Sequence, residues 1–291
     1  MKKYYNKFKD LESNDKENQK KSFKSLEEVL VFTSQGNILV KDLDGSIINL
    51  DGPHNAYRLC SNNGDLYYID GEQEVIFKMF SDKKIEHKFY TIEALLSYRN
   101  KLCYSVFDSL YEYPKTLKKT IEENHGISSL FEHNNSLFAL VTNWNDEDEN
   151  FEDSYLLDLY SDKKYHMGKD VTKTKSHNGN LYSIYRKNNH RIDSRMHGIL
   201  VEREGFISDL HTHNGNMYDF GEYAEVFNSF TDEVILRYNA VIDSICFHPR
   251  EDFVERGILK PNKKSTIITM KHSVPKVKSY VKGTYQDDLS V

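Results

Sequence analysis

Four histidines recur at one position of a sequence repeat, which makes them the first candidates for metal binding or acid-base catalysis. His133, His177, His213 and His248 each stand four residues before a recurring position that is mostly apolar. A repeat places equivalent residues in successive structural units, so these histidines should not converge on one ion. We expect each to hydrogen-bond the backbone of its own turn. His211 shares a strand face with His213, but no Cys or carboxylate stands at a supporting interval, and we predict no metal site.

Sequence signatures of the common catalytic and cofactor sites are missing from the chain. The patterns GxGxxG, GxxxxGK[ST], GxSxG and HExxH do not occur, which argues against nucleotide-binding, α/β-hydrolase and zincin functions. The 45 acidic residues are scattered, and no carboxylate pair stands out for acid-base work. We therefore predict no catalytic residue and no cofactor, and the sequence favours a protein that is not an enzyme.

The three cysteines, Cys60, Cys103 and Cys246, are odd in number and far apart. This spacing argues against a disulfide framework and against a CxxC metal knuckle, and it fits reduced thiols in the cytoplasm. Cys60 and Cys246 occupy the same place in their repeat units, where other units have Leu or Phe. We expect both to be core residues.

A short repeated phrase defines the elements that must position any site. Asn-Gly followed by an apolar pair occurs at 63–67, 178–182 and 214–218, with weaker copies at 100–104 and 135–138. Its apolar anchors recur about every 35 residues once an acidic insertion is set aside; they are Leu66, Leu102, Leu137, Leu181 and Met217. Asn-Gly between apolar runs predicts a hairpin, because a type I′ turn needs two positive φ angles. The 20 Tyr and 16 Phe against five Pro also favour strands.

Units of this length, read as four short strands each, resemble β-propeller repeat proteins as a broad class, over about Leu26 to Lys260. The resemblance implies an all-β ring of antiparallel blades. Counting anchors from Ile38 to Asp252 gives seven blades, or six if the Ile38 segment completes another blade. The WD40, kelch and sialidase signatures are missing, so no family is indicated and no functional residues carry over. We expect Ser265 to Lys271 to close the ring against Val29 to Thr33.

Charge and composition divide the chain into parts with different expected roles. Residues 1–27 hold eight Lys and five acids and should form a mobile or helical arm, whereas 28–283 should form the propeller. Asn145 to Asp153 is an acidic insertion that we expect to be a loop. Residues 260–283 are the Lys-rich closing segment, and 284–291 form a tail. The chain lacks a long apolar run and a secretory leader, which predicts no membrane span and a cytoplasmic location.

The leading hypothesis is a non-enzymatic β-propeller that serves as a platform for protein-protein interaction. Its charged arm, acidic loop and basic segment would contact an unidentified protein partner. The partner-binding candidates are Asp146, Asp148, Lys263, Lys264, Lys276 and Lys278.

The alternative is an enzyme or a small polar-ligand binder whose site lies at the mouth of the central channel. The first residues of the innermost strands would converge there. These candidates are Tyr57, Arg58, Glu93, Lys173, Asp209 and Asp243. A third hypothesis is nucleic-acid binding through the Lys-rich C-terminal segment, which would need a positive face on an otherwise acidic body.

Overall fold

Each repeat unit folds as one antiparallel sheet of four strands, and six such sheets are present. The computed structural model describes residues 27–50, 55–81, 83–86, 92–113, 116–121, 125–145, 150–186, 188–194 and 198–261. All of the strands belong to the unit that ends at Leu259. Among the described residues, no helix has the length and apolar character needed to cross a membrane.

Each sheet forms one blade, whose strands follow one another from the innermost to the outermost. Blade I contains β4 (Ala56–Asn62), β5 (Asp65–Asp70), β6 (Val75–Lys78) and β7 (Lys84–Glu86). Blade II contains β8 (Ile92–Tyr98), β9 (Lys101–Val106), β10 (Ser109–Glu112) and β11 (Thr116–Thr120). Blade III contains β12 (His125–His133), β13 (Ser136–Asn145), β14 (Asn150–Asp158) and β15 (Lys164–Lys169).

Blade IV contains β16 (Val171–His177), β17 (Asn180–Tyr185), β18 (Asn188–Ser194) and β19 (Gly198–Glu202). Blade V contains β20 (Ile207–His213), β21 (Asn216–Gly221), β22 (Glu225–Asn228) and β23 (Val234–Arg237). Blade VI contains β24 (Ser244–Pro249), β1 (Glu28–Ser34), β2 (Asn37–Lys41) and β3 (Ile47–Leu50), and the short helix α2 (Arg250–Glu255) follows β24.

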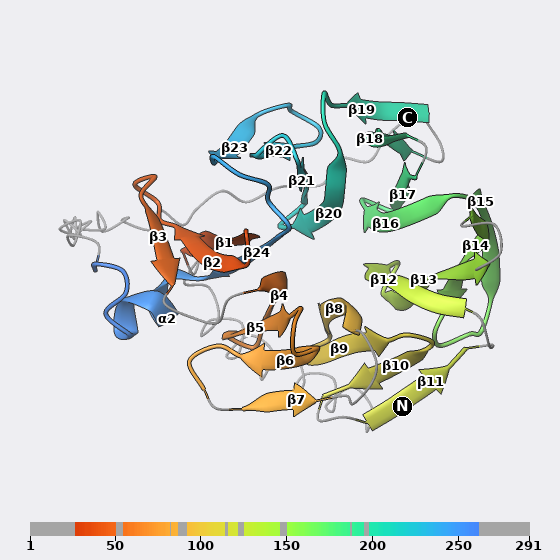
Figure 1. Cartoon of the computed structure of the whole chain (residues 1–291), viewed down its shortest axis with the longest axis horizontal. Helices are drawn as coiled ribbons and strands as arrows, with labels where there is room; N and C mark the ends of the chain where they lie inside the picture. The colour runs from red at the N-terminus through yellow and green to blue at the C-terminus, as the bar shows by residue number, and fades with distance from the viewer. Residues whose placement is uncertain are drawn as a thin grey trace, which may run out of the picture. The chain divides into compact units, whose positions relative to one another are not determined.

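The six sheets form a ring around a common centre (Figure 1). The innermost strands contact one another in chain order from β4 through β20 to β24, and β24 contacts β4. The protein is therefore a β-propeller, as the resemblance implied, and it has six blades, which was the alternative to the expected seven.

Blade VI joins the two ends of the folded chain. Its innermost strand β24 pairs antiparallel with β1, with Leu30 opposite Phe247. The other edge of β1 pairs with β2. The expected pairing of Val29 to Thr33 with Ser265 to Lys271 is therefore wrong, because both edges of β1 are occupied. Residues 265–271 lie outside the described residues.

The repeat anchors hold equivalent positions, as predicted. Each anchor is the second residue of the second strand of its blade: Leu66, Leu102, Leu137, Leu181 and Met217. The Asn63-Gly64 turn before the first of them has the expected pair of positive φ angles, 52° and 77°. Ile38 instead lies in the third strand of blade VI, and Asp252 lies in α2. The blade number is thus six, because the segments at Ile38 and Asp252 belong to one closing blade.

The acidic insertion lengthens a hairpin of blade III. Trp144 pairs with Phe151 and Asn145 pairs with Asn150. The strands β13 and β14 are therefore longer than the corresponding strands of the other blades. We expected a loop over Asn145 to Asp153. This is wrong for Asn145 and for 150–153, which belong to paired strands whose backbone groups hydrogen-bond each other. Residues 146–149 lie outside the described residues.

The core lies between neighbouring blades. Ile69 and Ile76 of blade I, for example, cluster with Ile92 and Tyr104 of blade II, and all four are almost fully buried. Inner strands such as β5 and β9 are therefore buried on both faces, which explains why they lack a simple alternation of buried and exposed residues. Cys60 and Cys246 are buried, as expected for core residues, and Cys103 is buried as well. Burial raises the thiol pKa of Cys60 to about 12.

Candidate functional site

Charged side chains from non-adjacent blades meet at the centre of the ring. Arg58 of β4 and Asp209 of β20 lie eight residues before their anchors, and Arg58 Nη1 lies 3.2 Å from Asp209 Oδ2. Their side chains keep 21% and 16% of their exposure, so the pair borders solvent rather than the closed core. Because blade VI separates blades I and V, this ion pair reaches across part of the centre.

Two lysines of β16 complete a group that we call the central cluster: Arg58, Lys173, Lys175, Asp209 and His211. Lys173 Nζ donates to the backbone oxygen of Ser128, and Lys175 Nζ donates to that of Leu130, both at 3.2 Å. The lysines thereby bridge blades IV and III while their charges act on Asp209.

The protonation of the central cluster reflects burial and mutual charge. Burial, with Arg58 nearby, lowers the pKa of Lys173 to about 8. Burial also lowers the pKa of Lys175. Burial alone would raise the pKa of Asp209, but the surrounding cations outweigh it and the pKa falls. His211 is neutral at physiological pH, since burial lowers its pKa to about 3. The cluster therefore places up to three positive charges around one carboxylate.

The other predicted channel residues lie at the edge of this cluster or outside it. Glu93 is exposed and acts on Lys173 through its charge. Asp243 is partly buried, and burial raises its pKa against the pull of Arg58. Tyr57 instead donates its hydroxyl to the backbone oxygen of Ile92, which ties blade I to blade II. Burial raises the pKa of Tyr57 to about 12.

The residues predicted for the channel mouth did not include Lys175 and His211. Each stands two residues after a predicted residue on the same strand, Lys173 and Asp209 respectively, and a strand points alternate residues to one face. That spacing is the signal that could have found them. Within the described ranges, no group of three or more His, Cys, Asp or Glu side chains is placed to hold a metal ion.

The predicted partner-binding residues all lie outside the described residues. Asp146 and Asp148 belong to 146–149, and Lys263, Lys264, Lys276 and Lys278 follow residue 261. The roles expected for the acidic and Lys-rich segments, nucleic-acid binding included, stay predictions.

The repeated histidines link neighbouring blades. His133 Nδ1 lies 2.7 Å from Ser176 Oγ in blade IV, and His248 Nδ1 lies 2.9 Å from Ser61 Oγ in blade I. For these two histidines, the expected bond to the backbone of the local turn is therefore wrong. Burial lowers the pKa of both. They are thus neutral hydrogen-bonding groups at a blade junction.

One face of the ring carries exposed apolar side chains on equivalent turns. Antiparallel order places the turns between first and second strands, and those between third and fourth strands, on the same face, which we call the turn face. The turns between third and fourth strands each present one large apolar residue, 38% to 61% exposed: Leu43, Phe80, Tyr113, Tyr160 and Phe230. In blade IV, residues 195–197 join the third and fourth strands along the chain and lie outside the described residues.

Local hydrogen bonds fix these turns. Asp158 Oδ1 accepts from the Tyr160 backbone N–H at 3.0 Å, and Asn228 Oδ1 accepts from that of Phe230 at 3.1 Å. Asp and Asn favour such turns because their side chains bond the backbone two residues onward. An aromatic residue, Ser or Thr, and Asp recur at 80–82, 160–162 and 230–232. This second repeated phrase was missed by the sequence prediction.

Each turn aromatic also covers the junction with the preceding blade. The ring centroid of Tyr160 lies 6.2 Å from that of Tyr98, and Phe230 lies 4.7 Å from His177. Tyr98 and His177 both stand four residues before their anchors. Tyr113 lies 6.4 Å from Tyr67. These rings are therefore partly packed and partly exposed on the turn face.

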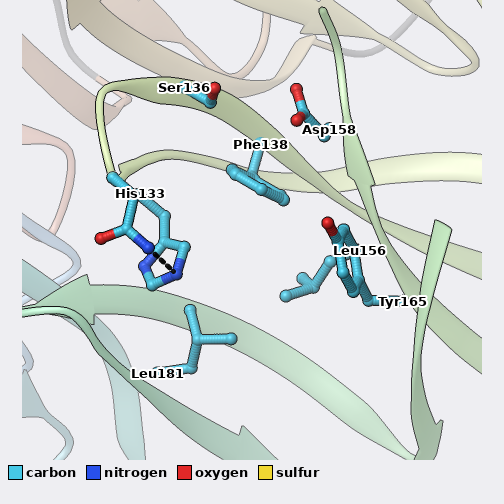
Figure 2. A pocket seen from close by; sticks show the side chains of 8 residues that line it. His133, Ser136, Phe138, Leu156, Asp158, Tyr165 and Leu181 are labelled. Carbon is cyan, nitrogen blue, oxygen red and sulfur yellow. Dashed lines mark hydrogen bonds between the residues drawn. The ribbon is translucent and has the colours of Figure 1, made fainter. Parts of the chain in front are cut away.

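A cavity of about 380 Å³ lies at the junction of blades III and IV (Figure 2). We call it the blade III niche. It is lined by His133, Asn134, Ser136, Phe138, Leu156, Asp158, Tyr165 and Leu181. Figure 2 shows Asp158 and Ser136 on one side of it, with His133 and Leu181 on the other.

Comparisons with known proteins support the fold and name no family. No family model matches the chain, and no curated protein matches it. A solved structure described as a nidogen/laminin complex is similar with a TM-score of 0.55 and 10% identity, covering 76% of this chain and 98% of that one. The computationally designed Ika8 protein gives a TM-score of 0.47 and 13% identity, covering 74% and 86%. The likeness to the first structure shows a propeller fold and nothing about function.

Proposed function

We propose that the protein is a non-enzymatic platform for protein-protein interaction and that its docking surface is the turn face. The observation that carries this proposal is the row of large apolar side chains on equivalent turns of five blades. Exposed apolar residues that are scattered singly are ordinary, but here one recurs on the equivalent turn of each of five blades, on the same face.

The chemistry of the turn face also suits a protein partner. Arg99 lies over the rings of Tyr98 and Tyr160, at 5.1 and 5.8 Å, and Arg256 lies 4.3 Å from the ring centre of Phe80. Tyr, Phe and Arg are enriched at protein interfaces because they offer large contact areas with few rotatable bonds or several donors. The hydrogen bonds within the turns hold these side chains in place before a partner arrives, which reduces the ordering cost of binding.

The proposal is tested by quantitative capture from cell extract with matched variants. The turn-face variant carries Tyr160→Ser and Phe230→Ser. The control carries Phe107→Ser and Phe206→Ser, since those side chains are about half exposed on the opposite face. We expect the turn-face variant to lose a set of proteins that the wild type and the control both retain. Loss of the same set by the control alone would contradict the proposal.

A second candidate function is the binding of a small anionic ligand at the centre of the ring. It is favoured by the convergence of Arg58, Lys173 and Lys175 around the single carboxylate of Asp209. Calorimetric titration with small carboxylates and inorganic phosphate tests it, with Lys173→Met as the comparison. Heat released by the wild type and lost in the variant would support a central site, and equal responses would contradict it.

A further inference from the structure

The blade III niche has the same kind of walls as junctions that an aromatic side chain fills elsewhere in the ring. At the junction of blades IV and V, His177 and Tyr182 occupy the repeat positions of His133 and Phe138. There the ring of Phe230 lies 4.7 Å from His177 and 5.6 Å from Tyr182. The molecule itself thus shows what fits between a histidine and an aromatic residue at this position.

Blade III supplies three ring walls for an equivalent occupant. The Phe138 ring lies 5.6 Å from His133 and 6.1 Å from Tyr165. His133 is held in place, since its two ring nitrogens contact Ser176 and Asn134 at 2.7 and 3.0 Å. Offset and edge-to-face contacts with such walls favour an aromatic ring over an aliphatic chain.

The size of the niche also suits an aromatic side chain. A cavity of about 150 Å³ is enough to hold benzene. The volume here, about 380 Å³, leaves room for a phenol and part of its backbone. Residues 195–197, which join β18 to β19 along the chain and lie outside the described residues, contain neither Phe nor Tyr.

We infer that the blade III niche binds a Tyr or Phe side chain displayed on a turn of a partner protein. This inference rests on the proposed docking function of the turn face, and it identifies the chemistry that the partner must present. The partner's ring would occupy the position between blades III and IV that is equivalent to the position of Phe230 between blades IV and V. It would contact His133 and Phe138, as Phe230 contacts His177 and Tyr182, and Tyr165 and Leu181 would form the remaining walls.

The test is a nuclear magnetic resonance titration of isotope-labelled full-length protein. The probe is the peptide acetyl-Leu-Tyr-Ser-Asp-Lys-amide, which copies Leu159 to Lys163 of this chain. We expect amide shifts at Ser136, Phe138 and Leu181, and no shifts with the same peptide carrying Ala in place of Tyr. Tyr165→Ala removes one wall and should weaken binding about fivefold.

Phe230→Ala is the matched gain-of-binding control. It should open the equivalent niche of blade IV, so the peptide should also shift amides at His177 and Tyr182. Shifts there without shifts at Phe138 in the wild type would overturn the inference, because the blade III niche would then be closed. The absence of amide shifts at both the blade III niche and the opened blade IV niche would overturn the inference as well. A positive titration alongside a failed capture experiment would overturn only the docking proposal.

Discussion

At the scale of single residues, a buried ion pair fixes the last helix to blade VI. Arg250 Nε and Nη2 lie 2.6 and 2.8 Å from the two carboxylate oxygens of Asp42. Both side chains are under 10% exposed. This bidentate hydrogen bond lowers the pKa of Asp42. Charge-assisted pairs of this geometry are strong, and each partner depends on the other to offset its burial.

Removing Arg250 should therefore destabilise the ring. We expect Arg250→Met to lower the free energy of unfolding by about 3 kcal/mol, because it leaves the buried Asp42 carboxylate unpaired. Chemical denaturation of the variant and the wild type at neutral pH measures the difference. The double variant with Asp42→Asn should recover part of the loss. A single variant as stable as the wild type would show that the pair has no structural role.

Lys173 gives a pH dependence with a defined sign. Its pKa in the folded protein is about 8, against an ordinary value of 10.5. Between those values the unfolded chain binds more protons than the folded one, so Lys173 makes stability rise with pH. The free energy of unfolding of the wild type, minus that of Lys173→Met, should therefore increase as pH rises through 8 toward 10.5. If the difference in unfolding free energy between the two proteins does not change over this pH range, the lowered pKa of Lys173 would be contradicted.

Part of the central cluster could be predicted from sequence because Arg58, Lys173 and Asp209 share one repeat position. Equivalent positions on innermost strands converge in a ring, whatever their neighbours. Tyr57 was also predicted at the centre, but its long side chain reaches the adjacent blade and bonds the backbone of Ile92 instead. The blade III niche could not be predicted. It depends on whether a turn of the next blade places an aromatic ring over the junction, and the sequence alone does not show which turns and junctions meet.

At the scale of the secondary-structure elements, β24 decides whether the ring closes. It supplies the innermost strand of a blade whose other three strands come from the start of the folded chain. From sequence alone, the run Ser265 to Met270 is β-branched and apolar, so it was expected to be the strand that closes the ring. Ile242 and Ile245 align with innermost-strand positions of other units, and that alignment is the better guide. Long-range pairing is decided by register and by the number of blades, neither of which a single segment shows.

Truncated chains can test whether β24 or the segment Ser265 to Met270 closes the ring. A chain ending at Lys260 keeps β24 and α2, so we expect it to melt cooperatively within a few degrees of the full chain. A chain ending at Asp243 lacks β24 and exposes an edge of β1, so we expect it to aggregate or to lose cooperative melting. Circular dichroism and light scattering distinguish these outcomes. Equal behaviour of the two truncated chains would show that β24 does not close the ring.

At the scale of the whole molecule, the ring separates two surfaces with different chemistry. The starts of the innermost strands bring charges to the centre, toward the face opposite the turn face. The ends of the same strands carry the repeated histidines and Tyr98, next to the apolar turn residues. One repeated unit thus generates a charged centre and the apolar turn residues, because the strands of every blade run in the same directions. The propeller could be predicted from the anchor spacing, whereas the turn face could not, because the sequence does not show which turns lie on the same side of the ring.

The proposed docking role of the turn face can be tested in cells by site-specific photo-crosslinking. A photoreactive phenylalanine analogue would replace Tyr160 on the turn face and, separately, Phe107 on the opposite face. These residues are 61% and 50% exposed, so both sites tolerate a probe. We expect discrete crosslinked protein partners from position 160 and none of those partners from position 107. Crosslinks to the same partners from position 107 alone would contradict docking through the turn face.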